Sequence, residues 1–212
     1  VNGVDPMGLW KYWDHESLTT QSLADSMPDG INAECKKHIE QVILEANLGQ
    51  DSGSAFNENE RHFNRGIGER PSNWINAYKN YLDLEKGLFK INLEMINGEC
   101  DTGGEKLSCD DALRALGRLT HSWQDFFGHA VGTDGSPIVW SNGNGGTPDN
   151  IDTNSIMPSS FGGFIYLGGQ HRWIEPAYAD VGEAQMRLCS ARNYVSQQYN
   201  SMLPYWYNKC KC

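Results

Sequence analysis

The sequence predicts an all-α domain with long irregular loops. Apolar side chains recur three and four residues apart in five segments, which is the spacing of one face of a helix. Turn-forming Pro, Gly and Asn residues separate several of these segments. The chain lacks sustained alternation of apolar and polar residues, and it lacks internal repeats. Its 212 residues correspond to the length of one domain.

The first two helices are expected at about 17–27 and 31–48. Pro28, Asp29 and Gly30 stand between them and favour a turn. The segment that follows, 50–70, is polar and rich in glycine, so we expect it to form a loop.

Two longer helices are expected next. The third begins after Pro71, since proline is favoured in the first turn of a helix, and it ends before Asn97 and Gly98. The fourth begins at Ser108, a favourable N-cap residue followed by acidic side chains in the first turn, and it runs to about Val131.

The segment 132–170 holds a large share of the Gly, Asn, Ser and Pro residues and predicts a long irregular connection. Connections of this length in a compact domain are usually functional or mobile. Two aromatic patches, at 138–140 and 161–166, are expected to anchor it. A last helix is expected from about Pro176 to Leu203, before a tail that carries cysteines.

Charge and hydropathy exclude two kinds of protein. Seventeen Lys and Arg residues against 27 Asp and Glu residues give a net charge of −10. A protein that binds long nucleic acid by its phosphates gains affinity from a basic surface, which this chain lacks overall. An enzyme that engages a single phosphate through metal ions is still compatible, because bound cations reverse the local charge. No apolar run approaches the roughly 18 residues that a membrane span requires.

Six cysteines are present, at Cys35, Cys100, Cys109, Cys189, Cys210 and Cys212. Since none forms a CxxC pair, a structural zinc knuckle is not expected. Cys100 and Cys109 flank a turn-rich stretch that a disulfide would close, and Cys189 is a candidate partner for either cysteine of the tail. Two interpretations stay open: disulfides in an oxidising compartment, or reduced thiols in the cytosol.

The most informative pattern is His121, Asp125 and His129. Residues at i, i+4 and i+8 of a helix lie on one face, so the three side chains are expected to project together. Imidazole and carboxylate are ligands that suit zinc. With six histidines and 27 acidic residues, this pattern would arise by chance roughly 0.02 times. The competing interpretation is a pair of core histidines satisfied by Asp125 and backbone groups.

Other histidines lie in settings that fit metal ligands. His171 and Glu175 repeat the i, i+4 spacing near the start of the last helix, although roughly 0.8 such pairs arise by chance and a surface pair is an alternative. His62 lies in the polar loop, and His15 follows an aromatic run. His38, beside two lysines, is expected at the surface.

The stretch 116–129 resembles the zinc-dependent phospholipase C superfamily, and especially its Het-C-type branch, whose helix reads approximately LGxxxHxxQDFxxH. Three further elements resemble that family in order along the chain. They are the early histidine followed by Leu-Thr within 15–19, the HF element at 62–63 and the HxxxE pair at 171–175. The resemblance covers positions 10–175, and its central motif is specific.

This resemblance implies a phospholipase C-like helical bundle around two or three zinc ions. The ligand sets it implies are His62, His121 and Asp125 for one ion, and His129, His171 and Glu175 for a second. A third ion would be held by His15 and the amine of Trp10, with Asp125 as a bridging ligand. A further carboxylate would orient the attacking water. Asp51 is the candidate for that role, with Glu58 and Glu60 as competitors, so Asp51 and Asp125 are the expected catalytic residues.

The superfamily also contains secreted zinc nucleases specific for single strands, which share the fold and the trinuclear site. In both groups an N-terminal Trp lends its amino and carbonyl groups to one zinc. In the nucleases the first histidine follows that Trp by five positions, as His15 follows Trp10 here. Glu175, by contrast, is the choice of the phospholipases.

The stretch from Val4 to Trp10 resembles the DPxGL(W) terminus of the Rhs/YD-repeat core. In those polymorphic toxins the shell ends at this motif, cuts itself, and a variable toxin domain follows. The resemblance implies that residues 1–9 are a remnant of the shell and that residues 10–212 are the toxin domain. Cleavage after Leu9 would leave Trp10 as a new N-terminus and supply its α-amine as a zinc ligand.

Together these resemblances imply a zinc-dependent phosphodiester hydrolase, delivered as a toxin effector to the envelope of a target cell. Phospholipase C-like cleavage of phospholipid head groups is favoured by the central motif, the acidic charge and the aromatic side chains of 132–170. A nuclease of the same superfamily is the alternative, and a non-enzymatic membrane-disrupting module is a second. The implied partners are a phospholipid surface, the Rhs shell as carrier and a cognate immunity protein, with nucleic acid a partner only of the nuclease.

Overall fold

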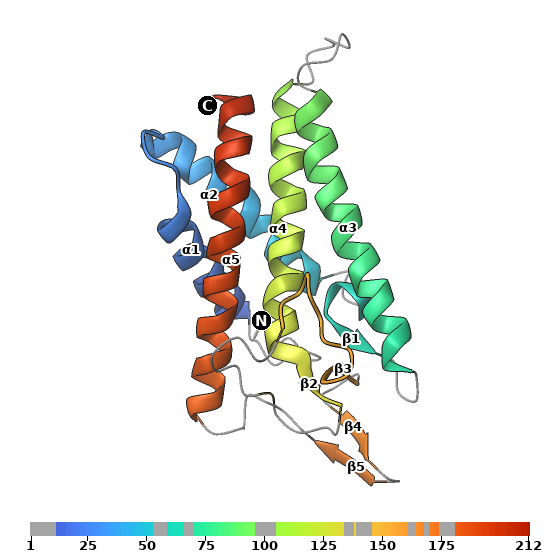
Figure 1. Ribbon diagram of the computed structural model, residues 1–212. Coiled ribbons are helices and arrows are strands. Elements are labelled where there is room, and N and C mark those ends of the chain that lie inside the picture. Colours follow the sequence, from blue (N-terminus) through green and yellow to red (C-terminus); the bar gives the residue numbers. More distant parts are fainter. Residues whose placement is uncertain are drawn as a thin grey trace.

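Five α-helices make up most of the structure, a computed structural model that describes residues 12–52, 59–65, 70–95, 105–133, 138, 146–160, 164–167, 170–173 and 181–212. The helices are α1 (Tyr12–Ser26), α2 (Ala33–Leu48), α3 (Pro71–Met95), α4 (Glu105–His129) and α5 (Val181–Cys210). They pack side by side as a bundle (Figure 1). The predicted all-α fold is therefore confirmed.

Helix α4 is the central element of the bundle. It runs between α3 and α5, with α2 behind it (Figure 1). Every residue from Leu119 to Gly132 is buried. The apolar side chains of this region, including Trp123 and Phe126, belong to the same core cluster as those of the surrounding helices. A helix enclosed on all sides can carry polar side chains only where they satisfy one another, and this requirement governs the site described below.

Helix α4 approaches α2 closely at Gly117. A Cβ atom at this position would lie 2.7 Å from Cβ of Ala46 and against the carbonyl oxygen of Ile43. Only glycine permits this contact, since both neighbouring groups belong to the interior of α2. The close approach brings the last turn of α2 beside the polar face of α4.

Short strands replace part of the irregular connection expected at 132–170, and that expectation was wrong in part. Strand β2 (Ala130–Gly132) continues directly from α4 and pairs antiparallel with β3 (Ile156–Ser160). Strand β3 also pairs in parallel with β1 (Asn64–Arg65). A hairpin of β4 (Phe164–Leu167) and β5 (Gln170–Trp173) extends the sheet. Strands this short carry too few residues to leave an alternating pattern in the sequence.

The boundaries of three helices differ from the expectation by more than two residues. Helix α1 begins at Tyr12, five residues before the expected start, and therefore includes His15. Helix α4 begins at Glu105, so Ser108 lies within its first turn and is not its N-cap. Helix α5 continues to Cys210 and contains Pro204, although a proline usually ends or kinks a helix. Leu203 and Trp206 are buried on either side of this proline, and their packing holds the last turns in place.

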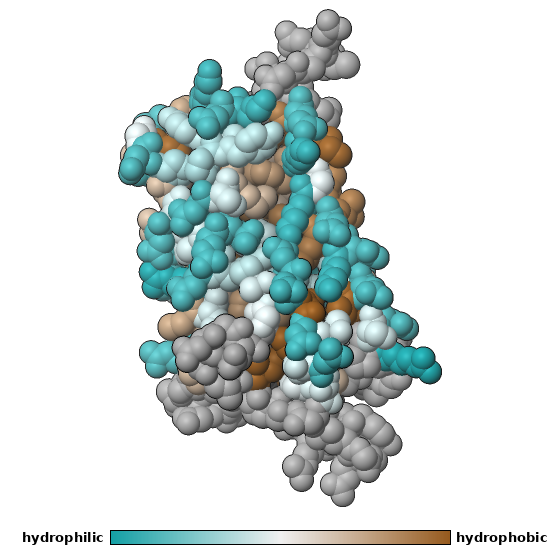
Figure 2. All heavy atoms as spheres, in the orientation of Figure 1, coloured by the Kyte–Doolittle hydropathy of each residue, from teal (hydrophilic) through white to brown (hydrophobic). Residues whose placement is uncertain are grey.

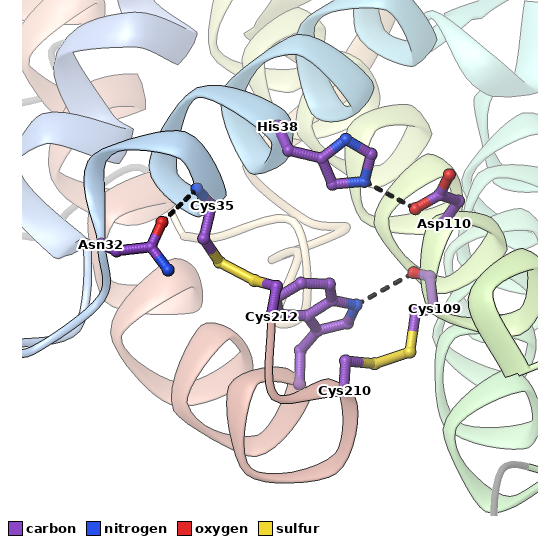
Figure 3. Close-up of a disulfide and its surroundings, with 8 residues drawn as sticks. Asn32, Cys35, His38, Cys109, Asp110, Cys210 and Cys212 are labelled. Carbon is purple, nitrogen blue, oxygen red and sulfur yellow. Dashed lines mark hydrogen bonds and ion pairs between the residues drawn. A yellow bond between two sulfur atoms is a disulfide. The ribbon is translucent and has the colours of Figure 1, made fainter.

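Two disulfides join the end of α5 to the beginnings of two other helices (Figure 3). Cys35 of α2 is bonded to Cys212, and Cys109 of α4 is bonded to Cys210. The pairing of Cys109 with Cys100 and the pairing of Cys189 with the tail were therefore wrong, and Cys189 is a free, exposed cysteine on α5. Sequence spacing misled here because the bonded residues are 177 and 101 positions apart. Disulfides are compatible with an extracellular or secreted protein.

Polar side chains cover much of the described surface, with apolar groups visible along α3 (Figure 2). Leu84 and Ile91 of that helix are 59% and 53% exposed. Within the described ranges, each long helix lacks the apolar stretch that crossing a bilayer would require. His38 lies near the surface, as expected, where its Nε2 is 2.7 Å from a carboxylate oxygen of Asp110 (Figure 3).

Replacing Gly117 by Ala is expected to destabilise the protein, because the new methyl group must push α2 and α4 apart. Overpacking of this kind costs about 1–3 kcal/mol. Gly87→Ala is the matched control: Gly87 lies in α3 with no atom near its missing Cβ, so alanine should stabilise that helix by about 1 kcal/mol. Urea unfolding with the disulfides intact measures both changes. An unfolding midpoint for Gly117→Ala equal to that of the wild type would contradict the close packing.

Candidate metal centre

One face of α4 carries His121, Asp125 and His129, as their spacing predicts. All three side chains are buried, with at most 1% of their surface exposed. Residues from α1, from the end of α2 and from the segment after it converge on this face. The carboxylate of Asp125 lies at the centre, and its two oxygens face two different groups of side chains.

The first group surrounds Asp125 Oδ2. This oxygen lies 2.9 Å from His121 Nε2 and 2.9 Å from His62 Nδ1, and the two imidazole nitrogens are 3.0 Å apart. Asp51 Oδ1 completes the group at 3.4 Å from His121 Nε2 and 3.9 Å from His62 Nδ1. Asp51 comes from the 3-10 helix η1 (Gly49–Asp51), and His62 directly follows η3 (Asn59–Arg61).

The second group surrounds Asp125 Oδ1. His15 Nε2 of α1 lies 3.3 Å from this oxygen, and His129 Nε2 lies 3.9 Å from it. The ring of His15 stacks on that of His121, with 4.4 Å between the ring centroids. Asp125 therefore joins the two groups, with one oxygen directed toward each.

The donor atoms of the first group are close enough together to surround one metal ion. Zinc binds nitrogen and carboxylate oxygen at about 2.0–2.2 Å in a tetrahedron, so neighbouring donor atoms should lie about 3.3–3.6 Å apart. The five distances given above span 2.9–3.9 Å around that value. Asp51, His62 and His121 form one potential metal-binding group, and His15, His121 and Asp125 form another.

Hydrogen bonds fix which nitrogen of each ring faces the centre. Gln124 Oε1 lies 2.7 Å from His15 Nδ1, and Asn47 Oδ1 lies 3.3 Å from His121 Nδ1. An amide oxygen can only accept, so in both rings Nδ1 carries the hydrogen and Nε2 is directed toward Asp125. A hydrogen bond from the ring nitrogen that does not face the metal is the usual means of orienting a histidine ligand.

The two amides are themselves held in place by Thr19. Its Oγ1 accepts hydrogen bonds from Asn47 Nδ2 at 2.9 Å and from Gln124 Nε2 at 3.0 Å. Asn47 Nδ2 also donates to Gln124 Oε1 at 3.0 Å. Because each amide nitrogen has acceptors, the amide oxygens are left to face the two imidazoles.

This tautomer leaves an electrostatic requirement at the centre. Burial lowers the pKa of His121 below its usual value, against the charge of Asp125, so the ring is neutral and its Nε2 presents a lone pair. That lone pair faces the carboxylate oxygens of Asp125 and Asp51. Both oxygens of Asp51 are buried and accept no hydrogen bond from the described residues. Such a cluster of electron pairs is stable only around a shared proton or a cation, and a metal ion meets this requirement.

Charges within the cluster shift the other pKa values. Burial opposes ionisation of Asp125, but His121, His129 and His15 around it hold the pKa of its carboxyl well below the usual value. Burial also opposes protonation of His15, but the hydrogen bond and charge of Asp125 outweigh it and raise the pKa of His15 to about 10. Burial lowers the pKa of His129. Without a metal ion, the proton that balances Asp125 resides on His15.

His62 is oriented by the residue that follows it. Phe63 has a positive φ of 48°, which is rare for a bulky residue and disfavoured by sterics. Its ring is fully buried and packs against Tyr78 and Phe126, with 4.8 Å between centroids in each case. This packing holds the unusual backbone conformation that turns His62 toward Asp125.

His129 ends α4, and Arg187 of α5 secures that end. The buried Arg187 Nη1 donates to the carbonyl oxygens of Phe127, Gly128 and Ala130 at 2.8–3.2 Å. These carbonyls lack partners within the helix, and a cation is favoured at this end of the helix dipole. Arg187 thus fixes the backbone on both sides of His129.

The structure brings together five of the eight predicted ligands, His15, His62, His121, Asp125 and His129, and places the expected catalytic residue Asp51 beside them. Asp51 lies among the possible ligands themselves, whereas we expected it only to orient water. Glu60 lies in η3 and belongs to neither potential metal-binding group. Trp10, Glu58, Glu175 and the shell remnant 1–9 lie outside the described residues.

The expected helical pair of His171 and Glu175 was wrong. His171 lies in β5, paired with Tyr166 of β4, and α5 is described only from Val181. Residues four apart also share a face on a strand, but they lie about 13 Å apart there, compared with about 6 Å on a helix. The structure describes the backbone of His171 but not its side chain, so its role as a ligand stays a prediction.

Sequence reasoning missed Asn47 and Arg187. Asn47 looks like an ordinary polar residue near the end of α2, and only the proximity of α2 and α4 reveals its contact with His121. Arg187 looks like a surface residue of α5, yet 2% of its surface is exposed. Gln124 belongs to the predicted motif, but its role toward His15 depends on the position of α1.

No protein-family model, no curated protein and no solved structure matches this chain.

Replacing Asn47 by Ala is expected to weaken zinc binding about 10- to 100-fold, because His121 loses the acceptor that fixes its tautomer. Asn47→Asp keeps an oxygen at this position and should bind zinc more tightly than Asn47→Ala. Gln41→Ala is the control, since Gln41 is an exposed amide on the same helix. Competition with a chromophoric chelator measures the affinities. Equal zinc affinity of Asn47→Ala and wild type would contradict the assigned role.

Zinc binding near pH 7 is expected to release the proton of His15. Its raised pKa means that the metal-free protein holds this proton from low pH up to about 10, so zinc must displace it. The apparent affinity should therefore rise with pH between 6 and 8. In the metal-free protein, protonation of His15 stabilises the fold. This contribution to the free energy of unfolding is complete below about pH 6.5 and is lost as the pH rises through about 10.

Calorimetric titration with zinc in buffers of different ionisation enthalpy measures this release. His15→Gln should release about one proton fewer than the wild type. Equal release by the two proteins would contradict protonation of His15.

Proposed function

We propose that this chain is a zinc-dependent phosphodiester hydrolase that acts as a toxin effector, with phospholipase C-like cleavage of phospholipid head groups as its reaction. The observation that carries the proposal is the fully buried carboxylate of Asp125, whose two oxygens face separate groups of histidines. A carboxylate shared in this way is the arrangement expected of a bridging ligand between two metal ions.

The residues would divide among up to three zinc ions. Asp51, His62, His121 and Asp125 would hold the first. His15 and Asp125 would contribute to another, together with the amine of Trp10 if cleavage after Leu9 exposes it. His129, with His171 and Glu175, would hold a further ion.

The chemistry follows from the charges that these residues assemble. Bound zinc ions would acidify a water molecule and neutralise charge on the phosphodiester under attack. Asn47 and Gln124 keep the imidazoles oriented, so that the centre is preformed when substrate arrives. Asp51 is the carboxylate of the first group that does not lie on α4. It is suited to hold the metal or to accept a proton from the attacking water.

Phospholipid is favoured over nucleic acid for two reasons. The central motif and Glu175 resemble the phospholipase branch, and a net charge of −10 disfavours a long polyanion. A phosphodiester head group presents a single charge that the metal ions themselves can neutralise. Delivery by an Rhs shell, release by cleavage after Leu9 and inhibition by an immunity protein rest on the resemblance of residues 4–10. The two disulfides agree with action outside the cytosol.

A nuclease of the same superfamily is the second candidate. The five-residue spacing between Trp10 and His15 favours it, because the zinc nucleases have that spacing.

Asp125→Asn is expected to reduce hydrolysis by at least 100-fold, because it removes the charge that both groups share. The protein is released at Trp10, loaded with zinc and offered liposomes of neutral phospholipid and single-stranded DNA in parallel. His38→Gln is the matched control, since His38 pairs with Asp110 away from the cluster.

Release of a phosphorylated head group by the wild type and His38→Gln, but not by Asp125→Asn, is the expected result. Cleavage of DNA alone would favour the nuclease. Toxicity that survives Asp125→Asn would favour a non-enzymatic membrane-disrupting module. A chain that binds less than one zinc by elemental analysis would overturn both enzymatic candidates.

A further inference from the structure

The residues that directly precede Asp51 and His62 are hydrogen-bonded to each other. Arg61 Nη1 donates to Gln50 Oε1 at 2.8 Å. Gln50 directly precedes Asp51 and Arg61 directly precedes His62. The nearest side-chain atoms of Asp51 and His62, Oδ1 and Nδ1, lie 3.9 Å apart. One contact therefore ties together the two ends of the segment that separates Asp51 from His62.

This contact is anchored to two helices. Gln50 Nε2 donates to the carbonyl oxygen of Ala46 in α2 at 3.1 Å, which fixes the side-chain oxygen in the direction of Arg61. The guanidinium of Arg61 lies over the ring of Tyr81 in α3, 5.3 Å from its centroid. The hydroxyl of Tyr81 approaches Gln50 Oε1 at 3.5 Å. Gln50 and Tyr81 are buried, so solvent does not compete freely for these contacts.

We propose that Gln50, Arg61 and Tyr81 form a clamp that positions Asp51 and His62 before zinc binds. The inference rests on the proposed function for the identity of the metal. Ligands on two ends of an intervening segment lose conformational freedom when a metal draws them together. The clamp orders these ligands during folding, so less conformational entropy is lost when zinc binds. The affinity of the first group for zinc is therefore higher.

The positioning role of Arg61 can be distinguished from the electrostatic effect of its charge. A guanidinium near a cation site repels the metal, so electrostatics alone predicts that Arg61→Ala strengthens zinc binding. The clamp predicts that the same change weakens it. The sign of the effect therefore distinguishes positioning from charge.

Zinc and cobalt binding to the full chain tests the proposal. Arg61→Ala and Gln50→Ala should weaken zinc binding at one site about 10- to 100-fold, as changes to residues that orient metal ligands do. Gln50→Glu keeps an acceptor for Arg61, now in a charge-assisted hydrogen bond, but loses the donor to Ala46, so it should recover part of the affinity that Gln50→Ala loses. Arg114→Ala is the matched control: it removes an arginine that is 45% exposed and is paired with Asp111.

Three readouts apply: chelator competition with Zn²⁺, the visible absorption of bound Co²⁺ as a report of ligand geometry, and hydrogen exchange at residues 49–52 and 59–62 in the metal-free protein. In Arg61→Ala, exchange should rise in both segments and the cobalt spectrum should change, while Arg114→Ala leaves both as in the wild type.

Zinc affinity in Arg61→Ala that equals or exceeds that of the wild type would overturn the clamp and leave the proposed function standing. Loss of affinity in Gln50→Glu as large as in Gln50→Ala would also overturn it. A wild-type chain that binds no zinc would overturn the proposed function, and the clamp would fall with it.

Discussion

The structure depends on one buried carboxylate. Asp125 lies in the interior of the bundle with none of its surface exposed, and a charge in such a place is costly unless its surroundings compensate it. The compensation comes from four imidazoles that approach from α1, from α4 and from the segment after α2. The helices must pack so that these rings meet, and the fold and the candidate site are therefore parts of the same arrangement.

This arrangement requires that the polar residues around Asp125 be buried and hydrogen-bonded to one another. Thr19, Asn47 and Gln124 satisfy one another and leave only the amide oxygens of Asn47 and Gln124 for the imidazoles. Buried polar networks stabilise a unique structure when every member has a partner, and they destabilise it otherwise. On the opposite side, Arg187 gives a donor to buried carbonyls at the end of α4 that lack partners within the helix. The cluster is thus enclosed by groups that serve its geometry.

Much of the fold and the centre of the site could be predicted from the sequence. The helices α1 to α4 have long periodic patterns, and the spacing of His121, Asp125 and His129 places them on one face whatever surrounds the helix. Long-range contacts could not be predicted in the same way. The disulfide partners, the contact of Asn47 with His121 and the bond between Gln50 and Arg61 depend on which helices are neighbours. The strand at His171 is too short to leave a pattern, and the helical spacing expected there was wrong.

Both disulfides lie at one end of the bundle, beside the beginnings of α2 and α4, and the histidine cluster lies toward the other (Figure 1). Along α4, the 16 residues from Cys109 to Asp125 correspond to about 24 Å. The disulfides therefore stabilise the end of the bundle that contributes no candidate ligand, whereas a bound metal ion would stabilise the opposite end. A thiol reductant and a chelator would each loosen only one end, so the chain with a metal ion bound would have two independent sources of resistance to unfolding.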